Sequence, residues 1–256
     1  MGWLVGQVSS IARQFRNPYV ALLGILLLSF TLLASFLNHR NLARRFSSDF
    51  PAFLAYFASF FLLLFAVPLV SFLLAGRAAG LAPAALGLRI GNWKLGLLSC
   101  LIVIPFGAIT LVNSVRDPVI RGQYPFSKDA MSTPLRFAVY EAAYILLYYL
   151  AWDFAFRGAL QFSLAALLAP GLPGTIVAIL VQTLASTVYH LGHPDSEIWG
   201  AFAVGLIFGA ITAVTGSVLY SFAIHAIVGV GNDIFIYRYT RNTRASRATP
   251  PRGAAA

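Results

Sequence analysis

Long apolar runs, each bounded by a short polar segment, form the main pattern of this chain. A helix that crosses a bilayer needs roughly 20 mostly apolar residues. The runs that reach or approach this length cover residues 19–37, 50–76, 95–113, 137–156, 158–194 and 198–232. Turn-forming residues at 170–174 and 215–217 divide the last two runs. The pattern predicts an all-α, polytopic membrane helix bundle of seven or eight transmembrane helices, because long runs without alternation do not suit a barrel.

Composition and charge agree with a membrane protein. Hydrophobic residues make up 59% of the 256 residues and charged residues only 10%, whereas soluble domains average about 25% charged. An ordinary soluble domain and a disordered chain are therefore excluded. The 18 Lys and Arg residues outnumber the 8 Asp and Glu residues, but they lie between apolar runs. This placement favours an anionic lipid surface as partner and speaks against nucleic acid. Cys100 is the only cysteine, which excludes an intrachain disulfide and a thiolate zinc site.

The runs and charges predict three regions along the chain. Residues 1–82 would hold an N-terminal interfacial segment and two transmembrane helices, residues 83–237 the core, and residues 238–256 a basic, disordered tail. Residues 3–16 suit either an interfacial helix or a frayed end. With eight spans and a cytoplasmic tail, the N-terminus would lie inside, and the loop that contains Arg40, Arg44 and Arg45 would lie outside.

Ionisable residues within the apolar runs are the candidates for chemistry, since charge in hydrocarbon is costly and usually functional. Asp153 and Arg157 are four residues apart and share a helix face. They form either a structural ion pair or a carboxylate oriented for catalysis. Glu141 lies about 120° away from that face, so we expect it at the interface near the helix start, without a catalytic role.

Two histidines on other predicted helices complete the candidate set. His190 ends one apolar run, and His225 lies in the middle of another, with Asn232 almost two turns further on the same face. Asp153, His190 and His225 could polarise a water for attack on a carbonyl, or hold a zinc ion with one open position. The sequence leaves both readings open. The remaining acidic and imidazole groups have structural explanations as helix caps and helix-end anchors: His193, Asp195, Glu197 and Asp233.

The order of these motifs resembles the CPBP family of membrane proteins (CAAX proteases and bacteriocin-processing proteins, also called Abi). Residues 152–158, Trp-Asp-Phe-Ala-Phe-Arg-Gly, are similar to a variant of the family's first motif that has Trp in the first acidic place. Residues 190–197 are similar to the second motif, His225 with Asn232 resembles the third, and residues 86–96 resemble the loop before the family core. The resemblance covers roughly residues 83–237.

The resemblance implies an intramembrane endopeptidase that hydrolyses membrane-associated protein or peptide substrates, in a multi-pass protein of the bacterial cytoplasmic membrane. By the same resemblance Asp153 and His190 would activate water, with Arg157 holding Asp153, and His225 and Asn232 would serve the oxyanion. The resemblance does not settle whether a metal ion takes part. No cofactor is certain, and zinc, if bound, would use Asp153, His190 and His225.

The chain departs from the family pattern at four positions. Trp152 stands in the place of the first acid, Asp153 in that of a glutamate, Ser186 in that of an aromatic residue, and Gly229 in that of an asparagine. The departures at Asp153 and Gly229 motivate an alternative, a non-catalytic protein on the same scaffold that binds peptide or lipid or acts in immunity. A proton-coupled transporter is a third reading, but paired broken helices are missing from the sequence.

Overall fold

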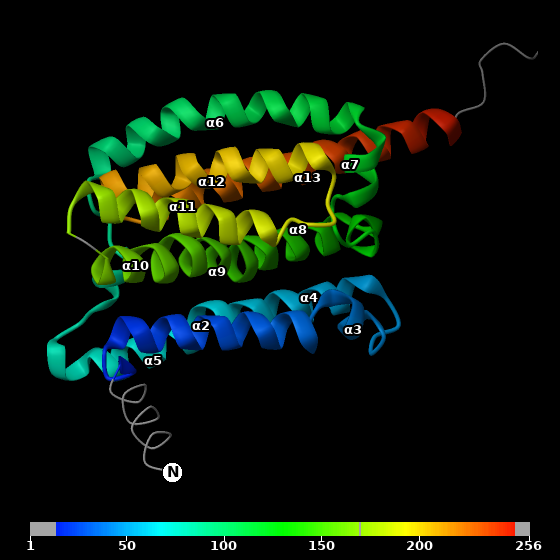
Figure 1. Cartoon of the computed structure of the whole chain (residues 1–256). Coiled ribbons are helices and arrows are strands. Elements are labelled where there is room, and N and C mark those ends of the chain that lie inside the picture. The colour runs from blue at the N-terminus through cyan, green and yellow to red at the C-terminus, as the bar shows by residue number, and fades with distance from the viewer. Residues whose placement is uncertain (1–13, 169, 249–256) are drawn as a thin grey trace, which may run out of the picture.

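The structure is a computed structural model, and it describes residues 14–168 and 170–248 (Figure 1). The predicted interfacial segment at 3–16 lies almost wholly outside the described residues. The described part contains helices and one isolated bridge, Leu191 to His193, but no strand. Its elements are α2 (Pro18–Ser35), α3 (His39–Ala43), α4 (Asp49–Phe61), η1 (Leu62–Ala66), α5 (Val67–Gly76), η2 (Arg77–Ala79), η3 (Pro83–Leu86), α6 (Trp93–Arg116), α7 (Pro118–Gln123), η4 (Asp129–Ser132), α8 (Pro134–Ala143), η5 (Tyr144–Tyr149), α9 (Leu150–Asp153), η6 (Phe154–Leu160), α10 (Gln161–Leu167), α11 (Leu172–Val188), α12 (Asp195–Thr215) and α13 (Leu219–Ala248).

Five helices are long and apolar enough to cross a membrane. They are Pro18–Ser35, Asp49–Ala79, Trp93–Arg116, Asp195–Thr215 and Leu219–Thr243. Large apolar side chains cover their outer faces, for example Leu101 at 73% exposed and Leu74 at 70%, as expected for surfaces that meet lipid. The predicted all-α membrane bundle is confirmed as a class, while the count of seven or eight spans stays a prediction.

The helices lie roughly parallel in three layers (Figure 1). One layer holds α2 and the run from α4 to α5, the middle layer holds the run from α8 to α10 with α11, and the third holds α6, α12 and α13. Gly205 and Gly209 let α12 approach α11 closely. A Cβ at Gly205 would lie 2.9 Å from Thr183, and one at Gly209 would lie 2.7 Å from Gln182. These glycines therefore serve close helix packing.

The middle layer is helical from Pro134 to Leu167, but its hydrogen bonding changes twice. The π-helical turns η5 and η6 lie on either side of α9, whose last residue is Asp153. Extra residues in π turns rotate the side chains that follow, and such turns are frequent at functional sites. The face on which each polar residue lies therefore cannot be obtained from a regular 3.6-residue period.

The loops after α2 and after α6 meet at one end of the bundle. The Asp49 carboxylate accepts hydrogen bonds from the backbone nitrogens of Lys128 and Asp129, at 2.9 and 3.1 Å. The guanidinium of Arg121 lies 5.0 Å from the centre of the Tyr239 ring on α13. The Arg40 loop and the C-terminal part of α13 therefore lie at the same end, and the expected topology, which separates them, is wrong.

The predicted disordered tail is partly helical. The last helix, α13, continues to Ala248 and extends beyond the bundle (Figure 1). The prediction of disorder is therefore wrong for residues 238–248, which are helical. Residues 249–256 lie outside the described residues.

Candidate active site

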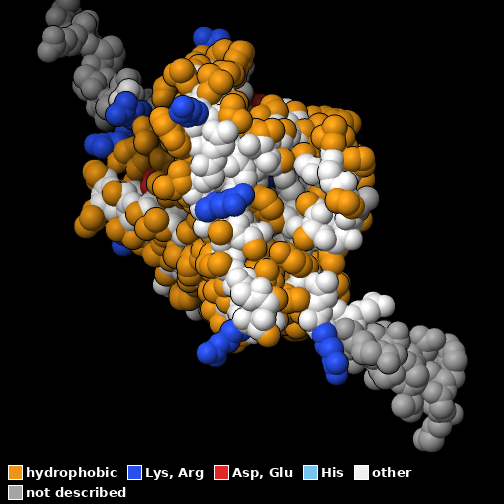
Figure 2. Space-filling view, turned by 90° about the vertical axis from the view of Figure 1, so that its left-hand side faces the viewer, with side chains coloured by type: hydrophobic (Ala, Val, Ile, Leu, Met, Phe, Trp, Pro, Cys, Tyr) orange, Lys and Arg blue, Asp and Glu red, His pale blue; other side chains and the backbone are white. Residues whose placement is uncertain are grey.

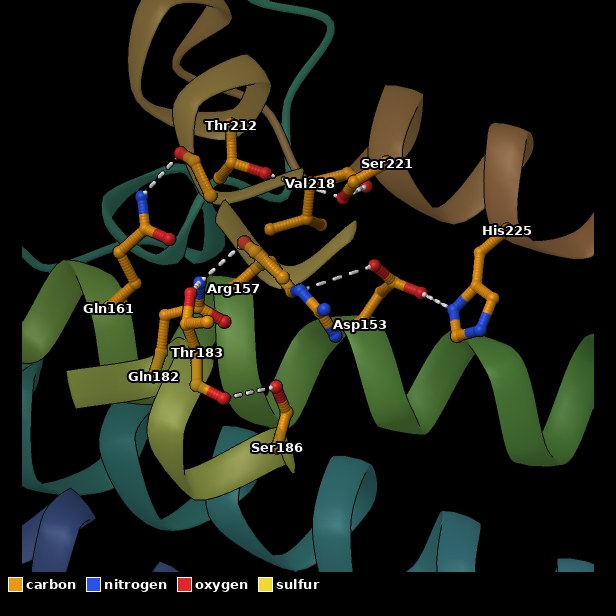
Figure 3. Close-up of polar contacts among 12 residues, drawn as sticks. Asp153, Arg157, Gln161, Gln182, Thr183, Ser186, Thr212, Val218, Ser221 and His225 are labelled. Carbon is orange, nitrogen blue, oxygen red and sulfur yellow. Dashed lines mark hydrogen bonds and ion pairs between the residues drawn. The ribbon is translucent and has the colours of Figure 1, made fainter. Parts of the chain in front are cut away.

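A hydrogen bond between Asp153 and His225 joins the first and third sequence motifs. The Asp153 side chain is fully buried, and its Oδ2 lies 2.8 Å from Nδ1 of His225, 72 residues further along the chain (Figure 3). A carboxylate can only accept, so Nδ1 carries the proton and donates it. This fixes the imidazole so that Nε2 is the free, basic nitrogen.

Arg157 faces the other oxygen of the same carboxylate. Its Nε lies 3.9 Å from Oδ1 of Asp153, and both side chains are buried. Oδ1, Nε and Nη1 make no hydrogen bond among the described residues. The guanidinium also packs over the Phe208 ring, 5.6 Å from its centre. The pair is therefore held by charge and by apolar packing, which makes each ion depend on the other.

His190 lies at the end of α11, close to the buried pair. Its Nδ1 is 2.8 Å from the backbone oxygen of Ser186, so Nδ1 donates and Nε2 again stays free. The Trp152 ring packs edge-on against it, with centres 5.3 Å apart. Burial lowers the pKa of His190. The structure thus brings Asp153, Arg157, His190 and His225 into one region.

A cavity of about 320 Å³ opens beside His190. Aromatic side chains form most of its wall, and Asp153 and His225 are not among the lining residues. Its lining comprises His39, Phe53, Tyr56, Gln123, Phe126, Tyr148, Trp152, Tyr189, His190, Gly192 and His193. Most small-molecule and peptide sites have this character, a largely apolar wall with a few polar groups.

Asn232 is the one candidate that lies apart from the others. Its amide nitrogen donates to Oδ1 of Asp233 at 3.3 Å, and no hydrogen bond joins it to His225. Glu141 also departs from expectation, because it is buried and interacts electrostatically with Asp233. The shared helix face placed Asn232 near His225 in projection, but two turns of helix separate the two side chains along the axis.

Tyr149 occupies the space beside Gly229, where the family pattern has an asparagine. A Cβ at Gly229 would lie 1.8 Å from the Tyr149 hydroxyl oxygen. The Tyr149 ring also packs on the His225 ring, with centres 4.5 Å apart. The missing side chain at Gly229 therefore leaves the space that Tyr149 fills. Tyr149 lies one turn before Asp153 on the same helical run.

Sequence reasoning missed a second imidazole–carboxylate pair. His193 Nδ1 lies 2.7 Å from Oε1 of Glu197, and Gln123 and Tyr124 contact the same carboxylate. The four-residue spacing of His193 and Glu197 was a usable signal for this pair. Gln123 and Tyr124 come from a loop some 70 residues earlier, and no sequence pattern points to them.

The described residues contain no group of three or more His, Cys, Asp or Glu side chains that could hold a metal ion. Oδ2 of Asp153 is taken by His225, and Oδ1 faces Arg157. A zinc ligand would need one of these oxygens free. The set Asp153, His190 and His225 therefore does not fit a zinc centre in this arrangement.

Together these features define a helical membrane protein with a buried carboxylate–imidazole–guanidinium group beside an aromatic cavity. Residues 134–230 match the model of a protein family described as type II CAAX prenyl endopeptidase Rce1-like. This match confirms the resemblance to the CPBP, or CAAX protease, family and supports a membrane protease at family level. Comparisons with curated proteins and with solved structures give no match. Asp153, Arg157, His190 and His225 lie inside the matched segment, and Asn232 lies two residues beyond it.

Proposed function

We propose that this protein is an intramembrane endopeptidase that hydrolyses membrane-associated peptide or protein substrates. The observation that carries the proposal is the 2.8 Å hydrogen bond between the buried Asp153 carboxylate and the half-buried His225 imidazole, inside the segment that matches a peptidase family. Burying a carboxylate and an imidazole costs several kcal/mol unless they are paired. Such a pair is kept more readily for function than for stability.

In the proposed reaction, two neutral imidazoles supply the bases. His190 and His225 each donate Nδ1–H to a fixed acceptor, so each presents a bare Nε2. Asp153 positions His225 and stabilises it once it has taken a proton, while Arg157 holds the carboxylate in place. Water attacks the peptide carbonyl, an imidazole takes its proton, and the proton passes to the leaving amine. The aromatic cavity suits an apolar substrate side chain next to the scissile bond.

The proposed location is the bacterial cytoplasmic membrane, with seven spans and the cavity at the cytoplasmic end. The five long apolar helices are joined by the run from Pro134 to Leu167 and by the shorter apolar helix Leu172–Val188. Lys and Arg residues are concentrated in the segments near the cavity: in and after α3 (Arg40, Arg44, Arg45), at the end of α6 and in α7 (Arg116, Arg121), beside η4 and in α8 (Lys128, Arg136), and in the C-terminal part of α13 (Arg238, Arg241).

The segments at the opposite end hold Arg16 just before α2, Arg77 in η2, Arg89 after η3 and Lys94 at the start of α6. Figure 2 views that end and shows separate Lys and Arg side chains on a surface of apolar and uncharged groups. Cytoplasmic loops carry the excess of Lys and Arg, so the richer end is assigned to the cytoplasm.

A cleavage assay in liposomes tests the proposed activity. Purified wild type, His190→Ala and His225→Ala are each incubated with a panel of membrane-anchored peptides. Wild type should cleave at least one peptide, and each alanine variant should lose about 10²-fold or more in rate, the usual scale for a general base. Val188→Ala, an exposed truncation two residues before His190, is the matched control. Absence of cleavage by wild type, or full activity in both histidine variants, would overturn the proposal.

A non-catalytic peptide- or lipid-binding protein is the second candidate. Two observations favour it. Trp152 packs on His190 where the family pattern has an acid, and Tyr149 fills the position beside Gly229. In this case the aromatic cavity would bind a ligand without turnover. Saturable peptide binding by a wild type that cleaves no peptide would support this candidate over the first.

A further inference from the structure

The second imidazole–carboxylate pair lies in the loop between α11 and α12. His193 precedes α12 by two residues, and Glu197 lies in the first turn of that helix. Nδ1 of His193 donates to Oε1 of Glu197 at 2.7 Å. The pair repeats the arrangement of His225 with Asp153, an imidazole held at Nδ1 by a carboxylate, and the proposed reaction does not use it.

A distant loop holds the Glu197 carboxylate in a fixed position. The Tyr124 hydroxyl donates to Oε1 at 2.6 Å, and the Gln123 amide nitrogen donates to Oε2 at 3.2 Å. Burial raises the pKa of Tyr124, and the nearby Glu197 carboxylate adds to that shift. The hydroxyl therefore stays protonated and donates. A carboxylate that served only to complement the helix dipole would not need these donors.

The imidazole of His193 lies beside that of His190 on the wall of the cavity. Their ring centres are 5.6 Å apart, and both residues line the cavity. No hydrogen bond to protein engages Nε2 of either ring among the described residues. A water that bonds to two nitrogens at about 2.8 Å each can bridge a gap of about 5.6 Å. The 5.6 Å here joins the ring centres, and rings this close on one cavity wall can each present a nitrogen to the same water.

Among the described residues, no carboxylate forms a hydrogen bond or ion pair with His190 itself. Trp152, in the place of the first motif acid, packs against His190 with the two rings nearly perpendicular. Asp153, the next residue, is engaged by His225 and Arg157. A carboxylate that supports a base on the cavity wall must therefore come from another element. Glu197 fills this role, because it holds His193, and His193 lines the cavity.

We infer that His190 and His193 together hold the hydrolytic water in the cavity, with Glu197 as the positioning residue of His193 and with Gln123 and Tyr124 fixing Glu197. The inference rests on the proposed endopeptidase function and adds His193 to its catalytic residues. The water oxygen forms a bond to the peptide carbonyl carbon, and Nε2 of His193 takes the water proton. The carbon–nitrogen bond then breaks, and the same proton goes to the leaving amine, which gives a carboxylic acid and an amine. Glu197 stabilises the transient imidazolium.

Kinetics of three variants test this assignment in the liposome assay. His193→Ala should reduce kcat by about 10²-fold or more, and added imidazole should restore part of the loss, because the truncated side chain leaves space on the cavity wall. Glu197→Gln keeps the shape but removes the charge, so kcat should fall at least about 10-fold with little change in KM. The matched control is Asp195→Asn, which removes a charge from the same helix turn at an exposed position and should leave both constants unchanged.

The outcomes separate this inference from the proposed function. The inference is overturned if His193→Ala keeps the wild-type kcat, or if Glu197→Gln and Asp195→Asn have equal effects. The proposed function still stands in that case if cleavage depends on His225. The inference also fails if His193→Ala loses activity that imidazole does not restore and Glu197→Gln changes only KM. The His193–Glu197 pair would then serve only to cap the helix.

An experimental structure gives a readout independent of turnover. It should show one ordered water within about 3.2 Å of Nε2 of both His190 and His193. If that water is present and wild type cleaves no peptide, the proposed function fails and the hydrolytic role of His193 fails with it. If wild type cleaves and no water bridges the two rings, only the inference is overturned.

Discussion

Replacing Asp153 by asparagine should separate the charge of the buried site from its shape. The asparagine oxygen can still accept from Nδ1 of His225, at the present 2.8 Å. The amide nitrogen would then face Arg157 in place of Oδ1, which is 3.9 Å from Nε. Two donors would meet there, and a fully buried guanidinium would lose its counterion.

The magnitude follows from that geometry. Two unit charges 3.9 Å apart at an effective dielectric constant of about 20 attract each other by about 4 kcal/mol. Removing one partner of a buried pair typically costs about 3–5 kcal/mol, which agrees with this figure. The bond to His225 also changes from charge-assisted to neutral, a loss of about 1 kcal/mol. Asp153→Asn should therefore lower the free energy of unfolding by about 5 kcal/mol and reduce kcat by about 10²-fold or more.

Thermal unfolding in detergent and the liposome cleavage assay measure the two effects. Asp153→Glu keeps the charge and should stay closer to wild type in both measurements, whereas Asp195→Asn should change neither. If Asp153→Asn unfolds at the wild-type temperature and cleaves at the wild-type rate, then the buried pair with Arg157 has neither the structural nor the catalytic role assigned to it.

Three further predictions concern neighbouring groups. Gly229→Ala places a Cβ 1.8 Å from the Tyr149 hydroxyl oxygen and should destabilise the protein by about 1–3 kcal/mol, an effect that Tyr149→Ala should relieve; an unchanged melting temperature in Gly229→Ala would contradict this. Both Glu141 oxygens are buried without a partner and near Asp233, so Glu141→Gln should raise the melting temperature, and a fall would show an unrecognised partner. Burial lowers the pKa of His190 below 6.5, so the unfolded chain binds this proton more readily than the folded chain. Stability and kcat/KM should therefore be maintained at pH 6.5 and decrease as the pH falls further. A pH profile of kcat/KM with its acidic midpoint above 6.5 would refute this.

The class of protein and the importance of Asp153 and His225 were predictable from the sequence. Apolar runs of about 20 residues specify membrane helices because a lipid-exposed backbone must satisfy its own hydrogen bonds. The cost of charge in such runs singled out Asp153 and His225.

The arrangement of the site depended on the tertiary structure. The π turns on either side of α9 shift which side chains face inward, so a regular helical period could not show that His225 pairs with Asp153. Asn232 shares a helix face with His225 in projection but pairs with Asp233, because distance along the axis also decides a contact. The Glu197 carboxylate gains its partners Gln123 and Tyr124 only where the chain brings the end of α7 against the start of α12. Local periodicity determines which residues a helix offers, whereas contacts between segments some 70 residues apart depend on how the helices pack.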